Sequence, residues 1–113
     1  MHEISLCESI IETVCKEATL ERFCRVKSIR LEIGRLSCVN PEAMFFAFNA
    51  VAKDTIADGA VLFIDAIPAK AWCKHCDADV EIMQRYDACP HCEYYPLEIK
   101  QGDAMRIKDM EVE

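Results

Sequence analysis

Two pairs of cysteines constrain this chain of 113 residues more than any other feature. Cys73 and Cys76 form one pair, Cys89 and Cys92 form the other, and a segment long enough for a short hairpin separates them. Two residues between thiolates let each pair hold one cation from a tight turn. The spacing predicts a closed tetrahedral site of four thiolates, with structural Zn(II) as the expected ion. An iron centre and a redox pair are the alternatives that the spacing leaves open.

Two histidines lie inside the cysteine pairs. His75 falls between Cys73 and Cys76, and His91 falls between Cys89 and Cys92. An imidazole so close to a thiolate can donate a hydrogen bond to sulfur, and its pKa near 6.5 allows it to compete as a ligand when the pH changes. We expect both histidines beside the ligands or in contact with solvent, with pH coupling as the alternative.

The charge and hydropathy of the chain exclude several classes of protein. With 13 basic and 20 acidic residues the net charge is -7, and no local basic patch offsets it, so nucleic acid is not an expected partner. No apolar run approaches the roughly 20 residues that span a bilayer, and the first residues lack the pattern of a secretion signal. We therefore expect a cytoplasmic protein without a membrane partner, whose paired cysteines bind metal instead of forming disulfides.

The residues from Ser5 to about Arg22 predict an amphipathic helix. Ser5 and Glu8 fit a capping box, which would start the helix near Ser5 and leave residues 1–3 outside, beside the positive end of the helix. Its apolar face would carry Cys7 as a small hydrophobic residue. The positions that share this face are Cys7, Ile10, Ile11, Val14 and Ala18.

Residues 26–34 alternate between apolar and polar and predict a half-buried strand. Asn40 followed by Pro41 predicts the start of a second helix, which we expect to end near Gly59. The apolar run at residues 61–64 then suggests the central strand of a small sheet.

These elements predict an α+β fold: a small mixed three-stranded sheet packed with two helices, plus an inserted zinc-ribbon-like domain. Residues 1–68 would form the first domain, completed by a final strand at residues 104–113, and residues 69–103 would form the zinc-binding domain. The tail is read as a strand because its apolar residues alternate, with one slip of phase that a bulge would allow.

The amino terminus offers a second set of metal donors. If Met1 is retained, its amine, the backbone nitrogen of His2 and the imidazole of His2 can close adjacent chelate rings. The backbone nitrogen of Glu3 could fill a fourth position. Such a planar, nitrogen-rich set suits Ni(II) or Cu(II), and binding should strengthen with pH because an amide must lose its proton.

Several short stretches follow one another along the chain: MHEISLC at residues 1–7, LEIG at 31–34, LSCV at 36–39, and then the two cysteine pairs. In this order they closely resemble the HypA/HybF family of hydrogenase maturation nickel metallochaperones. The resemblance covers essentially the whole chain.

The resemblance implies a nickel-binding domain at the amino terminus, an inserted zinc domain, and delivery of Ni(II) to the large-subunit precursor of a nickel–iron hydrogenase. A GTPase of the HypB family would be a second partner, and a homodimer is a further option. On the family pattern His2 is the principal nickel ligand, with the Met1 amine and backbone nitrogens beside it, and Glu3 supports the site. The zinc ligands match Cys73, Cys76, Cys89 and Cys92.

One departure from the family concerns Asn40, which lies where family members can place a carboxylate near the nickel; Glu42 is a candidate substitute.

We expect a chaperone and not an enzyme, because an exposed chelate at the chain end can release its ion more readily than a closed cage of thiolates. Two alternatives remain: a zinc-ribbon adaptor that binds a protein or nucleic acid, and a thiol redox enzyme that uses Cys73 and Cys76.

Overall fold

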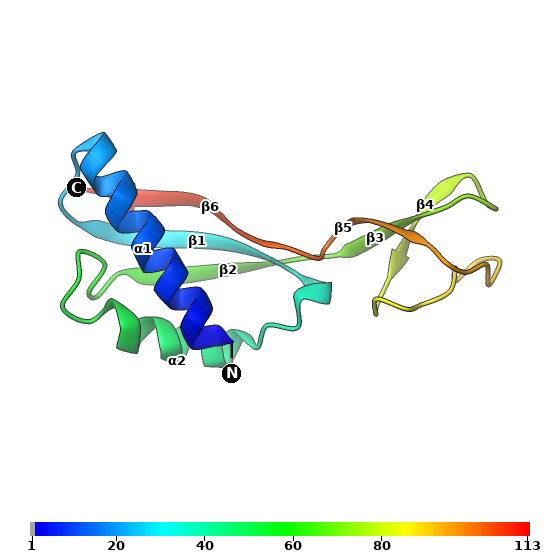
Figure 1. The fold of residues 1–113 in the computed structure, drawn as a ribbon, viewed down its shortest axis with the longest axis horizontal. Coiled ribbons are helices and arrows are strands. Elements are labelled where there is room, and N and C mark those ends of the chain that lie inside the picture. The colour runs from blue at the N-terminus through cyan, green and yellow to red at the C-terminus, as the bar shows by residue number, and fades with distance from the viewer. Residues whose placement is uncertain (1) are drawn as a thin grey trace. The chain divides into compact units, whose positions relative to one another are not determined.

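The computed structural model describes residues 2–113, so Met1 lies outside the described part of the chain. Two helices accompany two small sheets of three strands each, in the strand orders β2-β1-β6 and β4-β3-β5, which confirms the predicted fold class (Figure 1). The elements are α1 Glu3–Glu21, β1 Val26–Gly34, a 3-10 turn Arg35–Ser37, α2 Pro41–Ala52, β2 Val61–Ile67, β3 Ala69–Cys73, β4 Ala78–Ile82, β5 Glu98–Gln101 and β6 Met105–Val112. None of the helices in this part of the chain is long and apolar enough to cross a membrane.

The chain divides into two compact units. The first comprises residues up to Leu31, Val39–Ile64 and Ile107–Glu113, and the second comprises Glu32–Cys38 and Asp65–Arg106. The segment after β1 thus groups with residues 65–106. Which metal each unit serves stays a prediction at this point.

The start of α1 differs from the sequence prediction. The helix begins at Glu3 and not near Ser5, His2 precedes it, and the first helical bond runs from the backbone NH of Leu6 to the carbonyl of His2 at 2.9 Å. The predicted capping box is therefore wrong, because Ser5 lies inside the helix. The carboxylate of Glu3 sits instead at the positive end of α1 and accepts the backbone NH of Asn40, 37 positions away, at 3.2 Å.

The core of the first unit lies between α1, α2 and β1. Cys7 is fully buried, and its thiol lies 3.7 Å from the carbonyl oxygen of Met44. Burial, and then the charge of Glu3, raise the pKa of the Cys7 thiol to about 11, so Cys7 packs as a neutral hydrophobic residue, as predicted. The other buried apolar residues of these elements are Ile10, Ile11, Val14, Val26, Ile29, Leu31, Ile33, Met44, Ala47, Phe48 and Ala52.

Helix α2 starts where the sequence predicts. The side-chain oxygen of Asn40 accepts the backbone NH of Ala43 at 3.1 Å, and Pro41 is the first helical residue. The expected end near Gly59 is wrong, because α2 stops at Ala52. Lys53 leaves the helical region with φ -57° and ψ 132°, and the Thr55 hydroxyl then closes a turn on the Ala52 carbonyl at 2.6 Å.

Strand β2 lies at the edge of its sheet, and β1 is the central strand. The expectation of a central strand at residues 61–64 is therefore wrong. Leu62 is buried, whereas Val61 and Phe63 are about half exposed, and the guanidinium of Arg30 lies 4.6 Å from the centre of the Phe63 ring. An apolar run can thus be an edge strand whose outward ring is covered by a long cationic side chain.

The second unit is built on β3, which pairs antiparallel with both β4 and β5. At the end of β1 the backbone approaches Gly102 so closely that a Cβ on Gly34 would stand 2.2 Å from the Gly102 carbonyl carbon. The predicted final strand is confirmed, since β6 lies beside β1. The buried cluster of this unit is Leu36, Ala69, Ala71, Cys73, Val80, Ile82 and Cys89.

Candidate metal centres

The structure brings the four paired cysteines together. Cys73 ends β3 and Cys76 follows in a turn, while Cys89 and Cys92 lie in the turn that precedes β5. Their sulfur atoms all lie within 4.8 Å of one another. The Cys73–Cys92 distance is 3.6 Å and the Cys76–Cys89 distance is 3.9 Å. Four sulfurs about 2.3 Å from a tetrahedral Zn(II) stand about 3.8 Å apart, so the donor set fits structural zinc.

Backbone NH groups donate hydrogen bonds to two of the four sulfur atoms. The NH of Cys76 donates to the sulfur of Cys73, and the NH of His91 donates to the sulfur of Cys89, each at 3.4 Å. Burial opposes ionisation of Cys89, but the NH groups of His91 and Cys92 outweigh it and lower the pKa of Cys89 to about 6. Hydrogen bonding to Cys92, then burial, raise the pKa of Cys76 to about 12. Four thiols this close together resist full ionisation because their thiolate charges would repel one another. A bound divalent cation offsets that repulsion.

The two histidines lie near the cysteine cluster without joining it. His75 stacks on the ring of Tyr94, with ring centres 6.0 Å apart and planes inclined by 12°. His91 is exposed. Within residues 2–113 the metal-ligand group contains the four cysteines and neither imidazole. Both imidazoles therefore stay candidates for contact with solvent or for pH coupling.

The predicted nickel residues lie at the start of α1. The side chain of His2 is 51% exposed, and its Nδ1 lies 3.8 Å from a carboxylate oxygen of Glu3. Glu3 itself is buried. Hydrogen bonds from the amino-terminal group of the chain and from the backbone NH of Asn40 lower the pKa of Glu3 from 4.5 to about 2, so Glu3 is a carboxylate at neutral pH.

Two residues are candidates for an additional nickel ligand, Asn40 and Glu42. They differ in hydrogen bonding and in exposure. The side-chain oxygen of Asn40 caps α2, and its backbone NH is bound to Glu3. Glu42 is exposed in the first turn of α2, and it lines a hollow of about 580 Å³ together with Glu3, Ile4 and Phe46. Glu42 is thus the more accessible of the two. Sequence reasoning did not find the Glu3–Asn40 bond, because its partners are 37 positions apart and no local pattern marks them.

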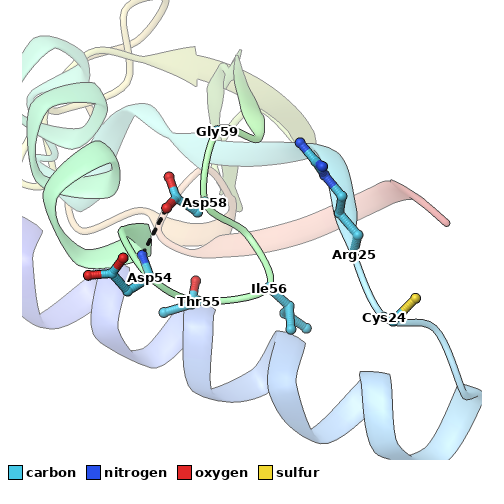
Figure 2. Close-up of a pocket in the computed structure, with 7 residues that line it drawn as sticks. All are labelled: Cys24, Arg25, Asp54, Thr55, Ile56, Asp58 and Gly59. Carbon is cyan, nitrogen blue, oxygen red and sulfur yellow. Dashed lines mark hydrogen bonds between the residues drawn. The ribbon is translucent and has the colours of Figure 1, made fainter.

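A second hollow, of about 690 Å³, lies elsewhere in the first unit, between the Cys24–Arg25 segment and the loop that follows α2. Figure 2 shows Asp58 turned toward the backbone nitrogen of Asp54, to which it is hydrogen-bonded at 3.0 Å. The carboxylate of Asp58 therefore shapes its own loop. Cys24 lines the hollow but belongs to no group of metal-binding side chains within residues 2–113, which agrees with its lack of ligand spacing.

The chain is similar to known proteins over its whole length. Residues 1–112 match the family model described as HypA, a hydrogenase/urease nickel incorporation metallochaperone. A hydrogenase maturation factor HypA of Azotobacter chroococcum mcd 1 is 48% identical over the whole of both chains. A hydrogenase maturation factor HybF of Morganella morganii is 42% identical, again over both chains in full.

The fold has a counterpart among solved structures. The solution structure of the Ni metallochaperone HypA from Helicobacter pylori matches with a TM-score of 0.74, covering 99% of this chain and 97% of that one. Its sequence identity is 24%, so this likeness concerns the fold alone.

Proposed function

Because the chain belongs to the HypA family of hydrogenase/urease nickel-incorporation metallochaperones, we propose that it binds Ni(II) at its amino terminus and delivers it to the large-subunit precursor of a nickel–iron hydrogenase. The family is one of maturation factors, and we propose that this chain has no enzymatic activity of its own. Nickel is its cargo. Zinc in the four-cysteine cluster is its structural ion.

The observation that carries the nickel site is the exposed imidazole of His2 at the first turn of a helix. The first helical hydrogen bond is accepted by the His2 carbonyl, so α1 does not need the backbone nitrogens of His2 and Glu3 for its own bonds. The proposed planar donor set consists of those two nitrogens, the imidazole of His2 and the Met1 amine. Such a set suits Ni(II). The Glu3–Asn40 bond supports this set by fixing the start of α1 against α2.

The two metals differ in how they are held. Cys73 and Cys89 are buried, and four thiolates close the coordination sphere of zinc, which suits a permanent ion. His2 is half exposed, which suits an ion that must leave. We therefore assign cargo binding to the first unit, and stability of the second unit to zinc.

Transfer of the cargo requires a protein partner at the nickel end. Ile4 and Phe46 are exposed apolar side chains, and both line the hollow that Glu3 and Glu42 also line. Exposed apolar side chains gathered at one place favour contact with another protein. The proposed partners are the large-subunit precursor and a GTPase of the HypB family.

The test measures Ni(II) binding by calorimetry in the intact zinc-loaded protein, in His2→Ala, and in a variant with one residue added before Met1. We expect both changes to weaken Ni(II) binding at least about tenfold, because each removes a nitrogen donor or its geometry. Zinc content should stay at one ion per chain in all three, which separates loss of nickel binding from misfolding. Equal nickel affinity in the three proteins would eliminate the amino-terminal site.

A further inference from the structure

A hollow of about 530 Å³ in the second unit has no part in either metal site. One wall is the segment after β1, with Arg35, Leu36 and Cys38, and the other is the loop after β4, from Met83 to Tyr86. Leu36 belongs to the buried cluster of this unit, so an apolar side chain anchors the first wall. We refer to it below as the two-arginine hollow.

The loop wall is fixed by its own hydrogen bonds. The carboxylate of Asp87 accepts the backbone NH groups of Met83 and Gln84, each at 2.9 Å. The guanidinium of Arg35 donates to the sulfur of Met83 at 2.8 Å, which joins the two walls. A thioether is a weak acceptor, so most of the five N–H donors of Arg35 stay available.

The lining of the hollow is positively charged and partly apolar. Arg35 and Arg85 both line it, no carboxylate does, and neither arginine has an ion pair within residues 2–113. Met83 is 60% exposed and Tyr86 is 78% exposed. Two guanidinium groups without an ion-pair partner in the described residues are unexpected in a chain with a net charge of -7. Arginine, tyrosine and methionine are also the residue types that protein interfaces favour.

We propose that the two-arginine hollow binds an acidic segment of a partner protein, in which carboxylates flank an apolar side chain. The carboxylates would pair with Arg35 and Arg85, whose planar guanidinium groups match a carboxylate in two parallel hydrogen bonds. The apolar side chain would lie against Leu36 and the exposed ring of Tyr86. A nucleic acid fits less well, because the charge of the whole chain repels a phosphate backbone and two arginines neutralise few phosphates.

The test is an NMR titration of the full-length, zinc-loaded protein with a short capped peptide of glutamates around a central leucine. Amide signals of residues 35–38 and 83–86 should shift, and added salt should weaken the binding. The double variant Arg35→Gln with Arg85→Gln should lower the affinity at least about tenfold, and Tyr86→Ala should lower it severalfold. The matched control is Lys27→Gln with Lys53→Gln, which removes the same charge from exposed positions of the first unit and should bind as the unmodified protein does.

Four results would overturn the proposal. The peptide could fail to shift the amide signals of residues 35–38 and 83–86. The arginine variant could also bind the peptide as tightly as the lysine control does. A single-stranded oligonucleotide could also shift the same amides at lower concentration than the peptide, which would assign the hollow to nucleic acid. A peptide with glutamines in place of glutamates measures the apolar contribution, and binding equal to that of the acidic peptide would count against the role of the arginines. One zinc ion per chain in each variant confirms that the second unit is intact.

Discussion

The carboxylate of Glu3 and the backbone NH of Asn40 lie 3.2 Å apart, so a hydrogen bond fixes the first turn of α1 against the residue that caps α2. A buried carboxylate thus lies directly beside the residue proposed to bind nickel. The effect of the Glu3 charge can be measured apart from the effect of its shape, because glutamine keeps the shape of glutamate and removes the charge.

Glu3→Gln tests this charge through the pH dependence of unfolding. The pKa of Glu3 is lowered from 4.5 to about 2 in the folded chain, so the ionised group stabilises the fold above pH 4.5, and this contribution disappears as the pH falls toward 2. The difference in melting temperature between the unmodified protein and Glu3→Gln should therefore be largest near neutral pH and shrink below pH 4.5. A difference that stays constant across this range would contradict the assigned pKa. Loss of zinc in acid affects both proteins equally and cancels in the comparison.

Cys89→Ser should abolish stoichiometric zinc binding and unfold the sheet of β3, β4 and β5. A small module of this kind buries too little apolar surface to fold without its ion, and zinc binding supplies about 10–16 kcal/mol in comparable peptides. Metal analysis and circular dichroism measure both effects. Cys24→Ser is the matched control, because Cys24 is exposed and lies outside the cluster, and it should retain the full zinc content.

Gly34→Ala should lower the free energy of unfolding by at least about 2 kcal/mol, because the added Cβ would stand 2.2 Å from backbone atoms of Gly102 and the backbone must move. Gly59→Ala is the control for glycine substitution. Gly59 has a φ of +79° but nothing within 4 Å of an added Cβ, so only the conformational cost of about 1 kcal/mol applies. Urea denaturation measures both. Equal losses in the two variants would show that the close approach at Gly34 does not constrain the fold.

Phe46→Ala and Phe48→Ala should differ strongly in stability. Phe48 is 1% exposed in the core, and its truncation should cost about 3–5 kcal/mol. Phe46 is 81% exposed, and its truncation should change stability by less than about 0.5 kcal/mol. If the hollow beside the proposed nickel site contacts a partner, Phe46→Ala should weaken binding of the proposed partner, the large-subunit precursor, measured by surface plasmon resonance with nickel-loaded protein. Unchanged partner affinity would remove Phe46 from the proposed contact.

Much of the fold follows from local patterns in the sequence. Strand β1 has the bounds that its alternation predicts, and Asn40 with Pro41 starts α2, because both signals depend on neighbouring residues. The end of α2 does not follow, since a turn closed by the Thr55 hydroxyl replaces the expected last helical turns. The edge position of β2 also does not follow, because an apolar run does not distinguish a buried strand from one covered by an arginine.

The two sites differ in the same way. The zinc cluster can be predicted because each cysteine pair is local and the spacing alone fixes the geometry. The surroundings of His2 could not be predicted, because the partner of Glu3 is the backbone NH of Asn40, the distant residue that caps a second helix. The predicted capping box at Ser5 is a local signal, whereas in the structure the helix starts at Glu3, whose carboxylate binds the distant backbone NH of Asn40.

The position of β6 beside β1 has a consequence for the order of folding during synthesis. Residues 105–112 are synthesised after every cysteine of the zinc cluster. Until then one edge of β1 exposes unpaired backbone groups, which are prone to join other chains. The four cysteines can therefore gather around their ion while β1 still lacks its partner β6, so the open edge of β1 is a place where new chains can aggregate before the sheet is complete.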